Sequence, residues 1–388
     1  MVRTPALLIA SASCAIAAAA FAQDALHAPP PGPPAGAVVR LEADRTDWLL
    51  GEDVALRLEV ENRGSQPLSL STGGDYRGTT RPERFTITAT REDGLAAEDP
   101  APNQNCEGGG TQTATIPPGG AWFTRVWLAS FRVIRDPGTW TVTVHHDLGW
   151  KEAPPASLRL RFRPALPFEA RLLVAAALAT EGEDWGTEHT LGWVLAPHRR
   201  PVAPTLRGIY HPEFLPALRD AAVRGEERAV LPIGRISTPE ATGVLAALLR
   251  TRHEGVAAAA AEALASRIPD PDHPDRPVFL NAWSWPFTSE FDRALVKAWV
   301  PHLGDRIRAA AREFVLQRGP ALRTAGARLL SRLSEVEDLP AIASALERAQ
   351  EEERTRGPGG DLDRWSPESW NRRLETQYLR TAFERVKK

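Results

Sequence analysis

The strongest constraint on the fold of this chain is a short motif that occurs three times in its C-terminal half. The copies are Gly-Arg-Ile at 234–236, Ser-Arg-Ile at 266–268 and Ser-Arg-Leu at 331–333. Their arginines, at positions 235, 267 and 332, lie 32 and 65 residues apart, which is one and about two periods of a helical repeat. We therefore predict a helical solenoid, a fold that exposes a long surface to binding partners.

Residues 168–388 have the composition and spacing of packed helices. Alanine, leucine and arginine dominate, and apolar side chains recur every three or four positions, as in the run 322–333. A stripe of this kind must be covered by neighbouring helices. Separate helices are expected at about 289–300 and 305–318, and a final helix within 370–386 is expected to pack back as a cap.

The helical part resembles bacterial HEAT-like repeats. A shift of 97 residues aligns Arg-Ile-Ser at 235–237 with Arg-Leu-Ser at 332–334, and it preserves the order of a helix, a short turn and a second helix. The resemblance covers about residues 212–353 and implies an all-α solenoid. Residues 269–288 interrupt the array, so its middle unit is expected to be irregular.

Residues 38–163 carry the two-residue alternation of half-buried strands. Between residues 53 and 62, aliphatic side chains fall on one face and charged side chains on the other. About seven such strands are expected, separated by turn signals such as Pro-Pro-Gly-Gly at 117–120 and Asp-Pro-Gly at 136–138. The pattern favours an antiparallel, all-β sandwich of the immunoglobulin-like (Ig-like) kind.

Three segments carry a resemblance to the Ig-like domains of bacterial secreted proteins. They are Gly-Glu-Asp at 51–53 with the strand that follows, the turn at 117–120, and Pro-Gly-Thr-Trp-Thr-Val at 137–142. The intracellular proteinase inhibitor family has a similar layout. The resemblance implies a fold, but no reactive inhibitory loop can be identified, so protease inhibition is not carried over.

The N-terminus predicts export. Arg3 precedes an apolar, alanine-rich stretch, and Ala20 and Ala22 are the small residues of a cleavage site, so residues 1–22 read as a signal peptide. Lipid anchoring at Cys14 is a minor alternative. Residues 23–37 are a proline-rich linker, which is stiff and extended. No second apolar run reaches the length of a membrane span, so we expect no stable membrane insertion and a secreted or periplasmic protein.

Charge and cysteine content narrow the functional classes. The net charge is −2, with no clustered basic surface, so we expect no nucleic-acid partner. Removal of the signal peptide leaves Cys106 as the only cysteine, which excludes an intramolecular disulfide. Cys106 has no neighbouring base, and a loop thiol is favoured over a nucleophile.

Two groups of residues suggest metal binding and are better explained otherwise. Asp270, Asp272, His273 and Asp275 place four donors within six residues, but intervening prolines stiffen the run and no second cluster completes a site. Alternation along a strand sends His145 and His146 to opposite faces, so a single site cannot use both. No sequence motif of a hydrolase, a zinc peptidase or a phosphate-binding loop occurs. We expect no catalytic residue, cofactor or metal site.

Aromatic residues in the interrupting loop are the best binding candidates. Trp283, Trp285 and Phe287 flank Pro286, and such side chains serve as anchors at protein interfaces. The competing interpretation is that they fill the gap left by the irregular repeat.

Three functions follow from these patterns. The preferred one is a noncatalytic protein-binding or scaffolding protein outside the cytoplasm, with a protein partner in the envelope or beyond it; it predicts exposed aromatic residues and no buried charge cluster. The first alternative is an envelope polysaccharide or cell-wall hydrolase with its site between the domains, since paired carboxylates can be distant in sequence. The second is a protease inhibitor that acts through the sandwich.

Overall fold

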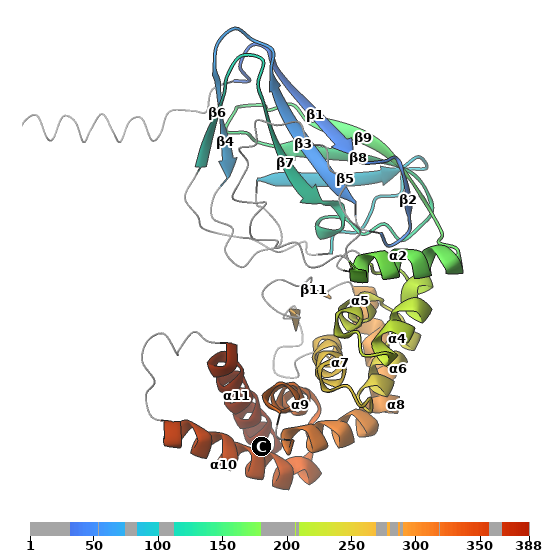
Figure 1. The fold of residues 1–388 in the computed structure, drawn as a ribbon, viewed down its shortest axis with the longest axis vertical. Helices are drawn as coiled ribbons and strands as arrows, with labels where there is room; N and C mark the ends of the chain where they lie inside the picture. The colour runs from blue at the N-terminus through green and yellow to red at the C-terminus, as the bar shows by residue number, and fades with distance from the viewer. Residues whose placement is uncertain are drawn as a thin grey trace, which may run out of the picture.

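A β-rich N-terminal region precedes a helical region, as the sequence predicts (Figure 1). The computed structural model describes residues 32–52, 54–73, 84–100, 112–179, 206, 209–268, 278–279, 286–287, 290–317, 319–356 and 367–387. The predicted signal peptide and most of the linker at 23–37 lie outside these residues.

The β-rich region is built from short strands that form two main sheets and one small sheet. The strands are β1 (Ala37–Ala43), β2 (Asp47–Leu49), β3 (Ala55–Asn62), β4 (Leu68–Gly73), β5 (Phe85–Arg91), β6 (Gln112–Ile116), β7 (Ala121–Trp127), β8 (Gly138–His146) and β9 (Ala156–Arg163). One main sheet has the order β1-β3-β7 and the other the order β2-β9-β8-β5, while β4 and β6 pair with each other.

The two main sheets share one apolar core, which makes the region sandwich-like. Leu56 and Leu58 from β3 face the same cluster as Ile87 from β5 and Val142 from β8, and each is at most 1% exposed. Their neighbours along each strand point outward, so the alternation read from the sequence is the alternation of burial. Full burial of each such side chain contributes about 1.5–3 kcal/mol to folding.

The expectation of a purely antiparallel sandwich is wrong at one edge. The three-residue strand β2 pairs in parallel with β9, with Trp48 opposite Phe162. Strand β2 is too short to show alternation, and its place is set by Trp48 and Leu49, both buried, rather than by a hairpin turn. A parallel partner distant in sequence leaves no local signal.

The small β4–β6 sheet covers a second apolar cluster. Leu68 and Leu70 of β4 pack with Ile116 of β6, and Leu148 and Trp150 from the loop after β8 complete the cluster. The pairing is antiparallel with an irregularity between Ser71 and Gly73.

The helical region begins at Pro167, shortly after β9 ends at Arg163. Its helices are α2 (Pro167–Ala179), α4 (Leu215–Val223), α5 (Val230–Arg235), α6 (Pro239–Leu248), α7 (Glu254–Arg267), α8 (Glu290–Val315), α9 (Pro320–Leu333), α10 (Leu339–Arg356) and α11 (Pro367–Lys387). Proline opens several of them, where its missing N–H costs nothing. At α6 the Thr238 side chain also accepts the Ala241 N–H and caps the helix.

Alternate helices contact each other and form two rows. One row is α2, α4, α6, α8 and α10, and the other is α5, α7, α9 and α11, with each helix touching the next member of its own row. Figure 1 shows α4, α6 and α8 along the outer side of an arc and α5, α7 and α9 inside it. Helices α7 and α9 are buried on almost every side, which explains their alanine and glycine content.

The expectation of two helices at 289–300 and 305–318 is wrong, because α8 runs unbroken from Glu290 to Val315. Pro301 and Gly304 lie inside it, and both residues destabilise a helix interior. Contacts of α8 with α6, α9 and α10 provide tertiary packing that outweighs this local cost.

None of the helices in the described ranges has the length and apolar composition that a membrane span requires.

The sandwich and the first helices share a packed joint. Leu49 of β2 belongs to the helical core together with Ile209 and Phe214. The Tyr210 N–H donates to the Gly51 carbonyl at 3.3 Å. The Tyr210 hydroxyl accepts the Ile134 N–H at 3.1 Å and lies 3.2 Å from the Ile134 carbonyl. These contacts fix the first helices to one end of the sandwich.

Gly51 is required at this joint for two reasons. Its φ of +75° is a backbone conformation that favours glycine. A Cβ at this position would also lie 2.6 Å from the His211 backbone N.

We predict that Gly51→Ala lowers the free energy of unfolding by about 2 kcal/mol or more, because it adds a steric clash to the backbone strain. Gly94→Ala is the matched control: Gly94 has a φ of +89°, but nothing lies within 4 Å of the place that a Cβ would occupy, so only the strain of about 1 kcal/mol remains. Urea unfolding followed by circular dichroism measures both; equal losses would contradict the role of the joint.

Candidate functional site

The predicted binding residues are only partly within the described structure. Trp283 and Trp285 lie outside the described residues. Phe287 lies in β11 (Pro286–Phe287), which pairs antiparallel with β10 (Val278–Phe279). Strand β10 contacts α7, so part of the interrupting segment lies against a helix of the inner row. Their role as binding residues stays a prediction.

The residues considered for metal binding do not form a site in the described part of the chain. Asp270, Asp272, His273 and Asp275 lie outside it, and so does Cys106, which was considered as a nucleophile. Within it, no group of three or more His, Cys, Asp or Glu side chains is placed to hold a metal ion.

The prediction that the two histidines of β8 face opposite ways is confirmed. His146 is 2% exposed and its neighbour His145 is half-buried on the other face.

Arg267, the last residue of α7, connects three helices. Its Nη2 donates to three carbonyls at the end of α5, those of Ile233 at 2.9 Å, Gly234 at 3.2 Å and Ile236. Its Nη1 donates to the Thr242 hydroxyl of α6 at 2.6 Å. The Ile233 and Ile236 carbonyls also accept backbone N–H groups. The end of a helix carries partial negative charge, so the guanidinium on α7 adds charge-assisted hydrogen bonds to the end of α5 and joins it to α6.

Other helix ends use the same arrangement. Arg228 donates to Leu178 of α2, Arg348 to Val315 of α8, and Arg385 to Leu330 and Ser331 of α9. Donor and acceptor are 34 residues apart for Arg267 and Ile233 and 33 for Arg348 and Val315. In each case a later segment holds the end of an earlier helix.

The three copies of the repeated motif, at 234–236, 266–268 and 331–333, fall at the ends of α5, α7 and α9. The first residue of each copy is small, Gly or Ser, and permits close packing there. At Gly234, for example, an added Cβ would lie only 3.1 Å from the Ala263 Cβ. The repeated motif therefore located helix ends of the inner row. It did not reveal that Arg267, at the end of α7, donates hydrogen bonds to carbonyls at the end of α5.

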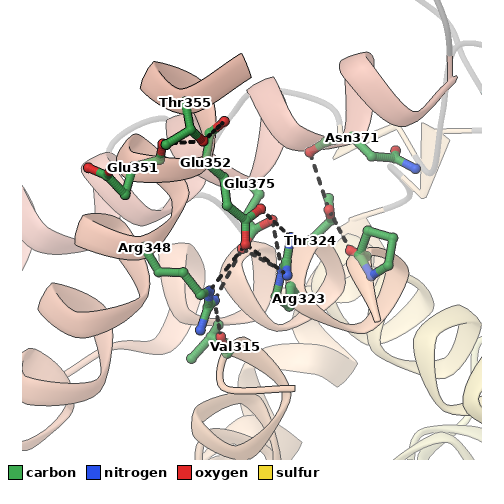
Figure 2. A network of polar contacts seen from close by, with 10 residues as sticks. Val315, Arg323, Thr324, Arg348, Glu351, Glu352, Thr355, Asn371 and Glu375 are labelled. Carbon is green, nitrogen blue, oxygen red and sulfur yellow. Dashed lines mark hydrogen bonds and ion pairs between the residues drawn. The ribbon is translucent and has the colours of Figure 1, made fainter. Parts of the chain in front are cut away.

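A buried charge cluster joins α9, α10 and α11 (Figure 2). Glu375 of α11 is 1% exposed and lies 3.1 Å from the Arg323 Nε and 3.5 Å from the Arg348 Nη2. Arg323 also pairs with Glu352 at 3.0 Å. Burial raises the pKa of the Glu375 carboxyl, against the attraction of Arg323 and Arg348.

The binding hypothesis predicted no buried charge cluster and is wrong on this point. The cluster does not resemble a general acid and base, because both Glu375 oxygens lie within 3.2 Å of the Arg323 Nε and the carboxylate is closed off by three helices. The ion pairs of Glu375 with Arg323 and Arg348 fix the position of α11 relative to α9 and α10.

Among the described residues, three exposed apolar side chains lie within seven positions of one another at the start of α2. Leu166, Phe168 and Leu172 are 54%, 51% and 65% exposed. Phe168 and Leu172 are four residues apart and share one side of the helix. Contiguous apolar surface of this kind is common where proteins bind one another.

No protein-family model and no curated protein matches this chain. Among solved structures, Spo0M, the sporulation control protein of Bacillus subtilis, aligns at 14% identity with a TM-score of 0.21, over 37% of this chain and 55% of that one. The PapD-like domain 7 of human CEP192 aligns at 15% identity and a TM-score of 0.14, over 33% and 87%. A β-glucosidase from Erythrobacter marinus aligns at 11% identity and a TM-score of 0.20, over 33% of this chain and 16% of that one.

These likenesses are distant. The match spans little more than half of Spo0M, and the TM-scores are too low to carry an argument about function. They assign no family.

We predict that Arg267→Met lowers the free energy of unfolding by about 3 kcal/mol, because it removes the buried, charge-assisted hydrogen bonds that Arg267 donates to the end of α5 and to Thr242 of α6. Arg252→Met, at an exposed position before α7, serves as the control and is expected to cost less than about 0.5 kcal/mol. Chemical denaturation of both variants decides the point, and similar midpoints would argue against the capping role.

The charge cluster predicts an asymmetry between its two partners. Arg323→Met leaves Glu375 buried beside one remaining arginine and is expected to cost about 3 kcal/mol or more. Glu375→Gln is expected to cost less, since burial already disfavours the charged carboxylate.

The double variant Arg323→Met/Glu375→Met is expected to be more stable than Arg323→Met alone. Glu351→Gln, at an exposed position of α10, is the control. Thermal unfolding of the set measures these differences, and an additive double variant would count against coupling of the two charges.

Proposed function

We propose that this chain is a noncatalytic, extracytoplasmic protein-binding or scaffolding protein, and that its helical region is a HEAT-like solenoid whose surface binds a protein partner. The observation that carries the proposal is the two-row arrangement of helices, in which each helix contacts the next member of its row. Such an array has a large surface for its mass and keeps its shape through neighbour contacts alone.

The corner arginines support a rigid surface. A guanidinium at the end of α5, α8 or α9 fixes the position of one helix relative to another, which lowers the entropy lost on binding. The exposed side chains of α2 add an apolar contact area at the end of the array next to the sandwich. The predicted signal peptide at 1–22 supports a location outside the cytoplasm.

The test is capture of a partner from the envelope extract of the source cells by the whole processed chain. Two variant sets probe the helical region: Phe168→Ser/Leu172→Ser on α2, and Trp283→Ser/Trp285→Ser in the interrupting segment. Leu95→Ser, at an exposed position of the sandwich, is the matched control. We expect one protein to be retained by the wild type and the control and reduced at least tenfold by one helical set.

Other outcomes reject the proposal. Retention that depends on Leu95 and not on either helical set would place binding on the sandwich and favour the inhibitor alternative. Release of soluble sugars from purified envelope polymer by the wild-type chain would favour the hydrolase. Circular dichroism of each variant confirms that loss of capture is not loss of folding.

A further inference from the structure

His146 occupies an apolar site at the end of β8. Its ring meets Phe85 edge to face, with centroids 4.6 Å apart, and lies 6.2 Å from the Trp122 ring. The side chain is fully buried although histidine is a polar residue that is seldom buried without partners.

The imidazole accepts one hydrogen bond. The Leu148 N–H donates to the His146 Nδ1 at 2.8 Å, so the proton of the neutral ring lies on Nε2. The Nε2 atom is buried and has no hydrogen-bond partner among the described residues. Leu148 has a φ of +54°, which is unusual for a residue other than glycine, and its N–H bond to His146 helps to hold that strained turn.

The turn after His146 is what attaches one end of the β4–β6 sheet. The Leu148 carbonyl accepts the Ser71 N–H at 2.9 Å, and the Trp150 indole N–H donates to the Ser69 carbonyl at 3.0 Å. The side chains of Leu148 and Trp150 also form part of the apolar cluster beneath that sheet.

We propose that His146 is an acid-sensitive clasp: the neutral ring holds the 147–150 turn and with it the β4–β6 sheet, and protonation of Nδ1 releases both. The proton binds the atom that otherwise accepts the Leu148 N–H. Two N–H groups then face each other, and a cation is left in apolar surroundings.

The charged neighbours do not relieve this conflict. The nearest carboxylate, Asp147, lies 3.9 Å from the His146 Nδ1, but its Oδ1 already accepts from Arg84 at 2.8 Å and from the Gly149 N–H at 3.0 Å. Arg84 and His145 disfavour a second positive charge.

Burial is the main cause that lowers the pKa of His146 to about 4; Asp147 opposes it and the cations assist. In the released state the ring returns toward its ordinary pKa of 6.5. The clasp is therefore at full strength above about pH 6.5 and weakens as the pH falls toward 4.

The other end of the small sheet has an anchor that does not titrate. The buried Asn62 side chain donates to the Ile116 carbonyl of β6 at 2.9 Å and to the Gln66 carbonyl at 2.9 Å. Acid should therefore free the sheet at the 147–150 end first, while β3 and β8 stay folded.

The experiment is hydrogen exchange of the whole chain at pH 7 and pH 4.5, corrected for the intrinsic pH dependence of exchange. We expect amides of β4 and β6 to lose protection by a factor on the order of tens at pH 4.5, with β3 and β8 unchanged. His146→Asn, whose amide oxygen can accept the Leu148 N–H and does not titrate, is expected to abolish the effect. His145→Asn, on the opposite face, is expected to retain it.

Three results overturn the proposal: unchanged protection of β4 and β6 at pH 4.5, an equal loss in His146→Asn, or simultaneous loss in all strands. An NMR titration of His146 in the wild type gives a second reading that needs no variant. Its midpoint must coincide with the loss of protection, and titration near pH 6.5 without structural change also rejects the clasp.

Discussion

The helical region depends on one interaction, the guanidinium of an arginine placed at the carbonyl end of an earlier helix. Arg267 does this for α5, Arg348 for α8 and Arg385 for α9. The carbonyl end of a helix carries partial negative charge, which favours a cation there. Several of these carbonyls also accept a backbone N–H, as Ile233 and Leu330 do, so the arginine bonds add to the backbone bonds. One planar side chain with five donors reaches several carbonyls and joins two or three helices at once. Apolar packing between the rows supplies most of the stability, while the arginines determine which helix ends meet.

The charge cluster between α9, α10 and α11 acts in a different way. A buried carboxylate between two arginines adds little net stability, because the cost of removing the charges from water offsets their attraction. It does penalise any arrangement that leaves Glu375 or Arg323 without its partner. Leu379 and Ala382 of α11 are fully buried apolar side chains, and apolar contacts of this kind are not specific for one register. The ion pairs distinguish the observed register from those alternatives.

Much of the architecture could be predicted from local patterns, and what was missed depends on contacts distant in sequence. Alternation identified β3 and β8 because each strand is long enough to show two faces. Strand β2 and its parallel pairing were not predicted, since three residues are too few to show the alternation of apolar and polar side chains. The continuous helix α8 could not be predicted, because Pro301 and Gly304 disfavour a helix locally and contacts with other helices outweigh that preference. Among the functional candidates, opposite placement of His145 and His146 followed from strand geometry, but the acceptor role of His146 required the Leu148 turn to be seen.

The joint at Gly51 has a mechanical consequence. Leu49 sits in the core of the helices, and the hydroxyl of Tyr210 is bonded to the backbone of Ile134 in the sandwich. A tensile load applied to the helices would therefore pass through this contact into the β-sheets, as well as through the short connection between β9 and α2, in which Ala165 is buried in the helical core. The sandwich and the first helices would transmit such a force as one unit for as long as the contacts around Gly51 and Tyr210 hold.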